Sequence, residues 1–419
     1  MKCVIMAGGK GTRISSVAAD IPKPMIQIDG VPVLEREILS LRDQGINDFI
    51  ITISHLGQVI TDYFHDGHEL GVNISYYDEK VPLGNAGALF QLKDQLTEDF
   101  LLINGDVLFD IDVNRFIAFH QEKKALVSLF AHPNDHPFDS SLFVTDDDDR
   151  VIAWLNKDDE RPAYYRNLVN AGLHILSPKV LERKIDKEKI DLDRDVLRPL
   201  CNDGMYAYAS SEYVKDMGTP ERYAKVSEDL IKGKVASRSL RNKQKAIFMD
   251  RDGTINHYVG FLTDINDMEL NPHAAEAIRK INASDYLAII ITNQPVIARG
   301  EVTFEQLRAI HNKLETLLGN EGAYIDALYF CPHHPDSGFE GEVRELKIDC
   351  DCRKPKPGMF FRARDAYNID LSASYMIGDG DNDVLAGSNA GCKCIKIERD
   401  GDLLEAVEKI LGEKDEGNR

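Results

Sequence analysis

The chain has little that would suit it to a membrane or to a polyanion. Of its 419 residues, 50 are Lys or Arg and 70 are Asp or Glu, so the formal net charge is −20. This excess of negative charge disfavours binding to nucleic acid and to anionic membranes. No apolar stretch reaches the length of a membrane span, and the opening apolar run ends at Gly8, which is short for a signal peptide. We therefore expect a cytoplasmic protein in which local groups of cations bind the anionic ligands.

Cysteine is also scarce, with seven residues in the whole chain, too few for a disulfide framework. Three of these cysteines and a histidine nevertheless form two tight pairs, Cys331-Pro-His333 and Cys350-Asp-Cys352. Three thiolates and one imidazole complete a tetrahedral set, which is typical of a structural zinc site. His334 competes with His333 for the fourth position, and buried free cysteines are the alternative to zinc.

Carboxylates follow an apolar run near the middle of the chain. The run Lys245–Met249 predicts a buried strand, and Asp250 and Asp252 come directly after it. At the carboxyl end of a strand in an open α/β sheet, such a pair suits phosphoryl transfer, because one carboxylate can attack phosphorus while the other delivers a proton. The alternative is a pair of loop carboxylates without a chemical role.

Three further motifs follow in order, the first and the last of them at the end of an apolar run. They are Thr292-Asn293-Gln294, Arg353-Lys354-Pro355 and Gly378-Asp379-Gly-Asp-Asn-Asp383. Together with the aspartate pair, the series resembles the four motifs of the haloacid dehalogenase-like (HAD) phosphatases. The resemblance implies that Asp250 is the nucleophile that forms an aspartyl-phosphate, and that Asp252 is the general acid and base. The remaining implied roles are substrate and phosphate binding by Thr292, Asn293, Arg299, Arg353 and Lys354, and Mg²⁺ binding by Asp250, Asp252, Asp379 and Asp383.

The zinc pattern narrows this resemblance to one group within the HAD phosphatases. With Ile297-Ala-Arg299-Gly and Pro357-Gly-Met, the residues from about 245 to 397 resemble heptose-1,7-bisphosphate phosphatase. Related zinc-loop enzymes that act on histidinol phosphate are the closest alternative. The segments between the motifs are too short for a separate cap domain, so we expect loop contacts such as Arg299 and the zinc lobe to set specificity. Pro295-Val296 stands where that family has a small Ser-Gly pair.

The first half carries a different phosphate-binding pattern. An apolar run, Lys2–Ala7, leads into Gly8-Gly9-Lys10-Gly11-Thr12-Arg13, and Pro22-Lys23-Pro24-Met25 follows. Glycines let backbone amides approach a polyphosphate, and Arg13 and Lys23 supply positive charge. The pattern is neither a Rossmann fingerprint nor a Walker A motif, because Ile14 replaces the last Rossmann glycine and no Gly-Lys-Ser/Thr appears.

Later motifs complete a resemblance to the sugar-1-phosphate nucleotidyltransferases over residues 1 to about 230. They are Leu83-Gly84-Asn-Ala-Gly87, Asn104-Gly105-Asp106, Leu155-Asn156-Lys157, Val169-Asn170-Ala-Gly172 and Asp216-Met-Gly218-Thr-Pro220. The resemblance implies catalytic roles for Arg13 and Lys23 and Mg²⁺ binding by Asp106 and Asp216. In this family a glutamate usually precedes the lysine found here at 157, whereas this chain has Asn156. The implied substrate- and phosphate-binding residues are Gly8, Gly9, Gly11, Thr12, Gly84, Gly87, Lys157 and Asn170.

Repeated strand-then-helix patterns in both halves predict an α/β protein with largely parallel sheets. We expect an N-terminal Rossmann-like, GT-A-like nucleotidyltransferase domain and a C-terminal Rossmann-like HAD phosphatase domain with a zinc-binding loop. The predicted boundaries are 1–232 for the first domain, 233–244 for a basic linker, 245–411 for the second domain and 412–419 for a frayed tail.

The two halves together predict a bifunctional enzyme that makes a nucleotide-activated heptose for cell-surface glycans. The phosphatase would remove the 7-phosphate of D-glycero-D-manno-heptose 1,7-bisphosphate. The transferase would then join heptose 1-phosphate to a nucleotide and release pyrophosphate, with GTP as the expected nucleoside triphosphate because the ADP route uses an unrelated transferase. Alternatives are a mannose-type transferase joined to a histidinol-phosphate-type phosphatase, and an N-terminal domain that only senses a nucleotide sugar. The oligomeric state is left open, a homo-oligomer included.

Overall fold

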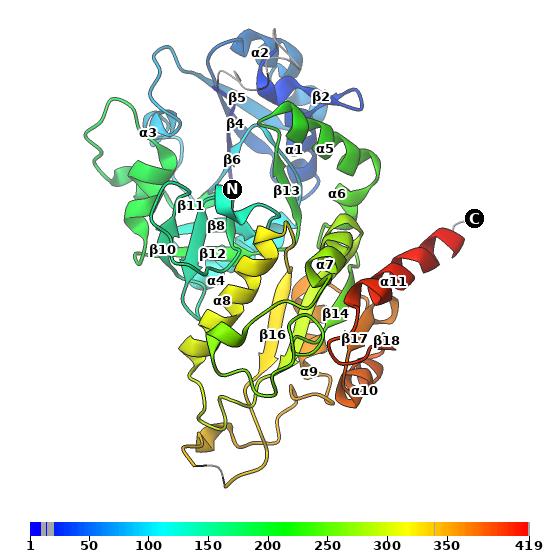
Figure 1. Ribbon diagram of the computed structural model, residues 1–419. Helices are drawn as coiled ribbons and strands as arrows, with labels where there is room; N and C mark the ends of the chain where they lie inside the picture. The colour runs from blue at the N-terminus through cyan, green and yellow to red at the C-terminus, as the bar shows by residue number, and fades with distance from the viewer. Residues whose placement is uncertain (10–13, 15–20, 339, 418–419) are drawn as a thin grey trace. The chain divides into compact units, whose positions relative to one another are not determined.

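The computed structural model of the protein describes residues 1–9, 14, 21–338 and 340–417. The chain forms two compact units, each with a sheet of its own (Figure 1). Two short segments from the first half of the sequence belong to the second unit, and no pattern in the sequence signals this. The first unit contains Met1–His132, Phe143–Trp154 and Asn170–Ser239, and the second contains Pro133–Leu142, Leu155–Val169 and the chain from Leu240 onward.

Within the described residues, the first unit has a nine-stranded sheet. Strand β1 (Cys3–Met6) pairs in parallel with β4 (Asp48–Ile53) and with β6 (Phe100–Asn104), whereas β11 (Val169–Leu176) runs antiparallel to β6. The α/β class is confirmed, and this sheet is mixed, with parallel pairs around β1 and antiparallel pairs at β11. The other strands are β5 (Asn73–Asp78), β8 (Val127–His132), β9 (Leu142–Thr145), β10 (Val151–Leu155) and β12 (Met205–Ala209).

Helix α1 (Val33–Arg42) covers the start of this sheet through a stripe at helical spacing. Its Leu34, Ile38 and Leu41 are fully buried in one cluster with Ile5 of β1. Such packing fixes the end of β1, which Gly8 and Gly9 follow in the chain. The unit also contains β2 (Gln27–Ile28), β3 (Val31–Pro32), α2 (Gly57–Phe64), α3 (Gly87–Gln91), α4 (Val113–Lys123), α5 (Pro220–Ile231) and α6 (Lys234–Ser237).

A two-stranded antiparallel ribbon brings together two distant segments of the first unit. Strand β7 (Val107–Asp110) pairs with β13 (Tyr213–Asp216), and Asp216 lies opposite Val107. The Met217 amide donates to the Asp106 carbonyl at 3.0 Å. The ribbon thereby places two carboxylates that are far apart in sequence on neighbouring backbone.

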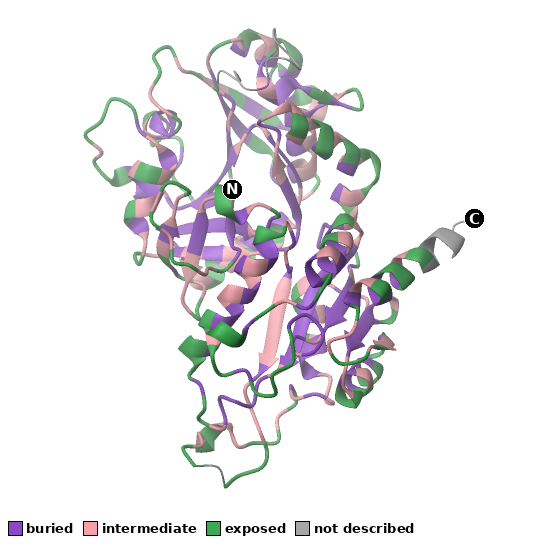
Figure 2. Cartoon of the chain, viewed as in Figure 1, coloured by how far each residue is buried: buried purple, intermediate pink, exposed green. Residues whose placement is uncertain are grey.

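The second unit has a parallel sheet with the order β16-β15-β14-β17-β18. Figure 2 shows its central strands buried and β16 at intermediate burial. The parallel arrangement predicted for this half is confirmed. The strands are β14 (Lys245–Met249), β15 (Tyr286–Asn293), β16 (Ala327–Cys331), β17 (Tyr375–Gly378) and β18 (Lys393–Lys396).

Helices cover both faces of this sheet because alternate residues of β14 point to opposite sides. Ile247 and Met249 pack in a cluster with residues of α7 (Ala274–Ala283), α8 (Phe304–Asn320) and α11 (Leu403–Gly417). Ala246 and Phe248 pack in a second cluster with residues of α9 and α10. The bounds of these last two helices are α9 (Gly358–Tyr367) and α10 (Asp381–Ala390).

The segment 155–169 contacts helix α8 inside the second unit. The Tyr165 amide donates to Thr316 Oγ1 at 2.9 Å, and the Asn167 amide donates to Glu315 Oε2 at 2.8 Å. Burial raises the pKa of Glu315 even though Arg166 and the Asn167 amide act in the opposite direction. These backbone-to-side-chain bonds explain why the segment clusters with the second unit.

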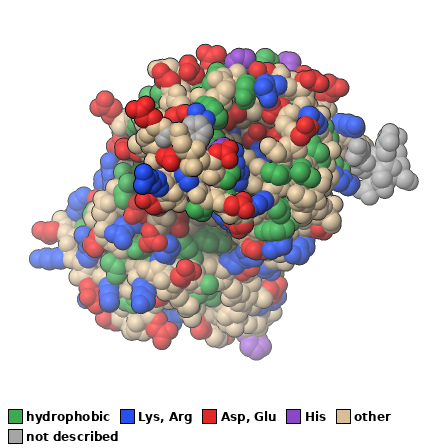
Figure 3. All heavy atoms as spheres, turned by 90° about the horizontal axis from the view of Figure 1, so that it is seen from below, with side chains coloured by type: hydrophobic (Ala, Val, Ile, Leu, Met, Phe, Trp, Pro, Cys, Tyr) green, Lys and Arg blue, Asp and Glu red, His purple; other side chains and the backbone are tan. Residues whose placement is uncertain are grey.

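The predicted linker is partly helical, since α6 lies within it and Val235 and Leu240 are buried. At the end of the chain, α11 continues through Gly417. Among the described residues, every helix is too short or too polar to cross a membrane. On the face drawn in Figure 3, acidic and basic side chains are interspersed and not gathered by sign.

Candidate active sites

Three aspartates of the second unit meet because two parallel strands end side by side. Strands β14 and β17 are neighbours, with Met249 opposite Ile377, so Asp250 and Asp379 emerge at the same edge of the sheet. Asp383 lies in the first turn of α10. The candidate ligand oxygens of the three aspartates lie within 4.8 Å of one another. Hard carboxylate oxygens at this spacing fit Mg²⁺.

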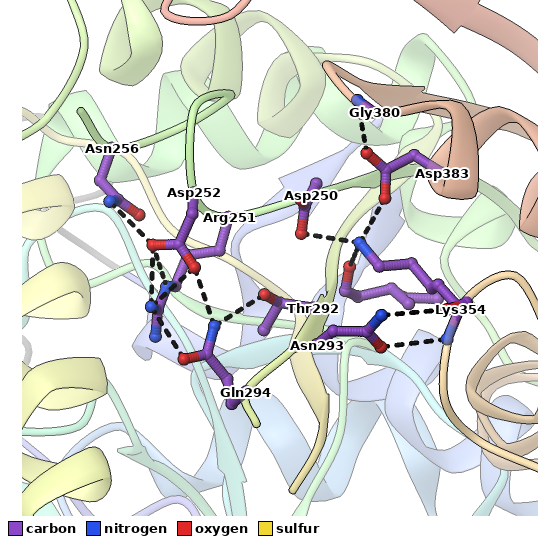
Figure 4. A network of polar contacts seen from close by, with 11 residues as sticks. Asp250, Arg251, Asp252, Asn256, Thr292, Asn293, Gln294, Lys354, Gly380 and Asp383 are labelled. Carbon is purple, nitrogen blue, oxygen red and sulfur yellow. Dashed lines mark hydrogen bonds and ion pairs between the residues drawn. The ribbon is translucent and has the colours of Figure 1, made fainter. Parts of the chain in front are cut away.

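Lys354 lies between two of these carboxylates (Figure 4). Its ammonium is 2.7 Å from Asp250 Oδ1 and 2.5 Å from Asp383 Oδ1, and it donates to the Ile291 carbonyl at 2.8 Å. Burial raises the pKa of Asp250 to about 7, and the neighbouring Asp383 and Asp252 act in the same direction against the charge of Lys354. The carboxylates therefore need positive charge at this site before all of them can ionise together.

Asp383 is held by the backbone around it. The Gly380 amide donates to Asp383 Oδ2 at 2.9 Å. A Cβ atom at Gly378 would lie 2.5 Å from the Cβ of Asp383. Glycine is thus required at the end of β17 for the carboxylate to reach the site.

Asp252 lies in a separate network, outside the group of three aspartates (Figure 4). Its Oδ2 accepts from Gln294 Nε2 at 2.8 Å and its Oδ1 accepts from Asn256 Nδ2 at 3.1 Å, while Arg251 donates to both oxygens. The side chain is therefore oriented by three donors. Its predicted part in Mg²⁺ binding stays a prediction.

The end of β15 joins the two networks. Thr292 is buried, and its Oγ1 accepts from Gln294 Nε2 at 2.9 Å. Asn293 exchanges two hydrogen bonds with the backbone of Lys354, at 3.0 Å to the Lys354 amide and 3.1 Å from Asn293 Nδ2 to the Lys354 carbonyl. Asn293 thus positions the loop that carries Lys354. Direct phosphate binding by Thr292 and Asn293 stays a prediction.

The cysteine and histidine pairs converge on one cluster. Cys331, His333, Cys350 and Cys352 place their ligand atoms within 4.8 Å of one another. The sulfur-to-sulfur distances are 3.3 to 3.5 Å, whereas a disulfide needs about 2.05 Å. Zinc bound at about 2.3 Å from each sulfur would hold tetrahedral ligands roughly 3.8 Å apart, so a small expansion of the cluster would fit the ion.

His333, and not His334, supplies the nitrogen of this cluster. His333 Nδ1 lies 3.4 Å from Cys352 Sγ, whereas His334 Nδ1 accepts from the Asp336 amide at 3.1 Å. Arg353 Nη1 donates to the His333 carbonyl at 3.2 Å. The cluster therefore braces the Arg353-Lys354 loop. A structural metal would bind in the cluster and hold this loop. Substrate binding by Arg353 stays a prediction.

Two arginines stack on exposed aromatic rings of the loop that follows the aspartate pair. Arg299 lies 4.4 Å from the Phe261 ring centroid and donates to Glu301 at 2.6 Å. Arg399 lies 3.9 Å from the Tyr258 ring centroid and donates to Asp379 Oδ2 at 2.8 Å. Cations at such rings suit the recognition of anionic groups. Substrate binding by Arg299 stays a prediction.

In the first unit, Lys23 forms an ion pair with Asp106. Asp216 accepts from Arg222 Nη1 at 2.7 Å and from the Gly218 amide at 2.7 Å. Burial alone would raise the pKa of Asp216, but Arg222, the Gly218 amide and Lys23 together lower it. Both carboxylates thus lie near the same lysine, and two carboxylate oxygen donors on neighbouring backbone fit a divalent cation.

The other predicted residues of the first half have varied surroundings. Gly8 accepts from Ser54 Oγ at 2.6 Å, and Gly9 is exposed. Asn170 Oδ1 accepts from the Gly172 amide at 3.1 Å. Lys157 belongs to the second unit, where its ammonium is 3.2 Å from Asp139. Three predicted residues, Gly11, Thr12 and Arg13, lie outside the described residues.

Gly84 and Gly87 shape a loop that is bonded to a distant backbone segment. Gly84 has φ +86°, and a Cβ atom there would lie 2.3 Å from the Ile190 carbonyl oxygen. The Ala86 amide donates to that oxygen at 3.0 Å. A Cβ at Gly87 would lie 2.3 Å from the Cβ of Leu83. Both glycines are therefore required by close packing, whatever they contribute to ligand binding.

Motif reasoning assigned no role to several residues of the second site. Arg251, Asn256 and Gln294 contact Asp252, and Arg399 contacts Asp379. The first three stand inside or next to motifs, so their position was a usable signal. Arg399 lies beyond β18 and carried no such signal.

The fold and these clusters define a class, namely a two-site enzyme of phosphorus chemistry with an α/β nucleotidyltransferase unit and a HAD-type phosphatase unit. Family comparison agrees with this class. The nucleotidyl transferase family model matches residues 2–233, and a HAD-hydrolase-like model matches residues 351–412.

Similar proteins are known for each half. Mannose-1-phosphate guanylyltransferase of Mycobacterium tuberculosis is 33% identical over 242 residues, 57% of this chain and 67% of the relative. D-glycero-beta-D-manno-heptose-1,7-bisphosphate 7-phosphatase of Escherichia coli O6:H1 is 39% identical over 156 residues, 37% of this chain and 80% of the relative. The crystal structure of HddC from Yersinia pseudotuberculosis has 30% identity and a TM-score of 0.48, and the match covers 55% of this chain and 99% of HddC.

The chain therefore belongs to the nucleotidyl transferase family, and its second half is a HAD-like phosphatase of the heptose-1,7-bisphosphate 7-phosphatase family.

Proposed function

We propose that the protein carries out two consecutive steps: hydrolysis of the 7-phosphate of D-glycero-D-manno-heptose 1,7-bisphosphate, then transfer of a guanylyl group from GTP to heptose 1-phosphate. The observation that carries this proposal is that one chain holds the Asp250, Lys354 and Asp383 cluster together with the Asp106, Lys23 and Asp216 cluster. A 7-phosphatase leaves the 1-phosphate in place, which is the group that a sugar-1-phosphate nucleotidyltransferase uses.

In the hydrolytic step, the Asp250 carboxylate attacks phosphorus and the bond from phosphorus to the sugar O7 breaks. Asp252 gives its proton to O7, so the sugar leaves as an alcohol. Asp252 then takes a proton from water, whose oxygen attacks phosphorus and releases Asp250 and inorganic phosphate. Asp250, Asp379 and Asp383 would hold Mg²⁺, which supplies positive charge to the phosphoryl oxygens. Lys354 adds charge from its buried position.

The transfer step needs no covalent enzyme intermediate. An oxygen of the sugar 1-phosphate attacks the α-phosphorus of the nucleoside triphosphate, and pyrophosphate leaves. Asp106 and Asp216 would hold Mg²⁺, and Lys23 lies beside both carboxylates. The protein's contribution is to align the reactants and to neutralise charge.

Guanine is supported by the similarity of the first half to a guanylyltransferase. The test supplies heptose 1,7-bisphosphate with each of four nucleoside triphosphates and identifies the product by mass. We expect GDP-heptose with GTP and little product with ATP, CTP or UTP. Equal or better product with another nucleotide would contradict the choice of base.

The same relative is named for mannose 1-phosphate, and this favours one alternative substrate for the first half. A direct comparison of kcat/KM for heptose 1-phosphate and mannose 1-phosphate separates the two readings. Pyrophosphate release with either sugar, lost in Asp106→Ala, would exclude a domain that only senses nucleotide sugars. Activity on histidinol phosphate with none on heptose bisphosphate would overturn the proposed phosphatase substrate.

A further inference from the structure

Arg251 stands between the two catalytic aspartates in sequence, yet its side chain is fully buried at 0% exposure. Its Nη2 donates to both oxygens of Asp252 at 2.8 Å and to Gln294 Oε1 at 3.0 Å. Its Nη1 lies 3.0 Å from Nε2 of His311. The guanidinium therefore links the carboxylate to His311 of helix α8, which lies sixty residues further along the chain.

The chemistry of this contact fixes the state of the histidine. A guanidinium remains protonated and has no acceptor, so Nε2 of His311 must offer its lone pair. Neutral His311 then carries its proton on Nδ1. Burial and the positive charge of Arg251 both lower the pKa of His311 well below its usual range, which agrees with this state. His311 packs against the Phe330 ring at 5.5 Å between ring centroids, so its orientation is set by the core.

An acceptor other than Asp252 matters because Asp252 changes its charge during the proposed reaction. When Asp252 is protonated, its ion pair with Arg251 weakens, and a guanidinium held by that carboxylate alone would be free to turn. His311 and Gln294 accept from Arg251 whatever the state of Asp252. They keep the guanidinium group of Arg251 in place, so that the carboxyl group of Asp252 returns to the same position each time it changes its charge.

We propose that His311 is a positioning residue of the phosphatase: as a neutral acceptor it locks Arg251, and Arg251 in turn holds Asp252 in line with the leaving oxygen. This proposal rests on the acid–base role proposed above for Asp252. His311 does not touch substrate in this account and acts only through Arg251.

A matched pair of variants tests the proposal in the full-length protein with Mg²⁺. His311→Gln keeps an acceptor near the position of Nε2, whereas His311→Met has a similar length but only a weak sulfur acceptor. Two substrates are compared: heptose 1,7-bisphosphate, whose alkoxide leaving group needs a proton, and p-nitrophenyl phosphate, whose leaving group does not. The readout is kcat/KM, which reports the step in which the leaving group departs.

We expect His311→Met to lose about 10- to 100-fold in kcat/KM on the heptose substrate, less than the roughly 100- to 10,000-fold of a lost acid catalyst because Asp252 itself is retained. On p-nitrophenyl phosphate its loss should stay within about threefold, and His311→Gln should stay within about threefold on both substrates. Arg251→Lys, which keeps the charge but removes the planar guanidinium group, should show the same dependence on the leaving group. It provides the test if His311→Met does not fold.

An equal loss on both substrates in His311→Met, or no loss on either, would overturn the positioning role. Asp252→Asn is the reference. If Asp252→Asn itself loses activity equally on both substrates, the acid role proposed for Asp252 fails first, and the two failures are thereby distinguished.

Discussion

The two sites differ in how deeply their charges are buried. In the phosphatase unit, the side chains of Lys354 and Asp383 are 2% and 5% exposed, whereas in the transferase unit those of Asp106 and Asp216 are 29% and 43% exposed. A covalent nucleophile benefits from a fixed, water-poor site, because neighbouring charges act strongly there. A transferase that only aligns two charged substrates can leave its carboxylates more open until the substrates bind.

From this difference in burial, we expect the largest loss of activity when a single side chain of the phosphatase site is changed. Asp250→Asn should lower heptose bisphosphate hydrolysis by about 1,000-fold or more, because the amide of asparagine cannot serve as the nucleophile that forms the acyl phosphate. Transfer from GTP to supplied heptose 1-phosphate should be unchanged. Phosphate release and pyrophosphate release, assayed separately, check both statements. Full phosphatase activity in this variant would refute the assignment of the nucleophile.

In the more exposed transferase site, a substitution should lower transfer and leave hydrolysis unchanged. Asp106→Asn should slow pyrophosphate release by about 100-fold, since one charged oxygen donor for the cation is lost. Phosphate release from heptose bisphosphate should remain at the wild-type rate. If Asp106→Asn slows both activities alike, the two clusters are not independent sites.

Loss of the zinc predicted for the cysteine and histidine cluster should also affect the stability of the two units differently. Removal of zinc, or Cys352→Ser, should destabilise the phosphatase unit by several kcal/mol. Each kcal/mol corresponds to roughly 2–4 °C in Tm for a unit of this size. Calorimetry should show the transition of the phosphatase unit shift to a lower temperature while transferase activity at 25 °C persists. Cys201→Ser, outside the cluster, is the control and should leave that transition in place.

The raised pKa of Asp250 makes Mg²⁺ binding depend on pH. Below about 7 the folded protein favours protonated Asp250, and Mg²⁺ has to displace that proton. The increase in Tm on adding Mg²⁺ should therefore be small at pH 5.5, grow through pH 7 and level off above it. Asp250→Asn should abolish this growth. A Tm increase independent of pH in the wild-type protein would argue against a cation at Asp250.

A smaller effect is expected from the glycine that packs closely in the first unit. Gly84→Ala adds a Cβ 2.3 Å from a carbonyl oxygen at positive φ, and we expect a loss of about 3 kcal/mol in the free energy of unfolding. Gly71→Ala is the matched control, because it has φ +71° with open space around the added atom. It should lose only about 1 kcal/mol. Equal losses in urea unfolding would show that φ alone sets the cost.

Sequence patterns predicted those features of the fold and of the sites that depend on residues close together in the chain. The apolar runs before Asp250, Thr292 and Asp379 form adjacent parallel strands of one sheet, so their polar ends meet. The cysteine and histidine pairs converge because each pair is local and one loop joins them. The choice of His333 over His334 needed coordinates, since both residues have suitable spacing.

Other features depend on tertiary packing and left no usable pattern. His311 occupies a buried position on an amphipathic helix, where sequence alone suggests an ordinary core residue. The mixed sheet of the first unit follows from the antiparallel pairing of β11 with β6, which apolar content does not encode. The assignment of segment 155–169 to the second unit rests on bonds to residues 315 and 316, about 150 positions away.

The central claim is that two separate sites act in order on one sugar. Phosphorus NMR of wild-type protein with heptose 1,7-bisphosphate, GTP and Mg²⁺ tests it most directly. We predict that inorganic phosphate appears before pyrophosphate, and that each reaches one equivalent per sugar. Pyrophosphate released while the 7-phosphate is still attached, or phosphate released with no pyrophosphate to follow, would contradict the account.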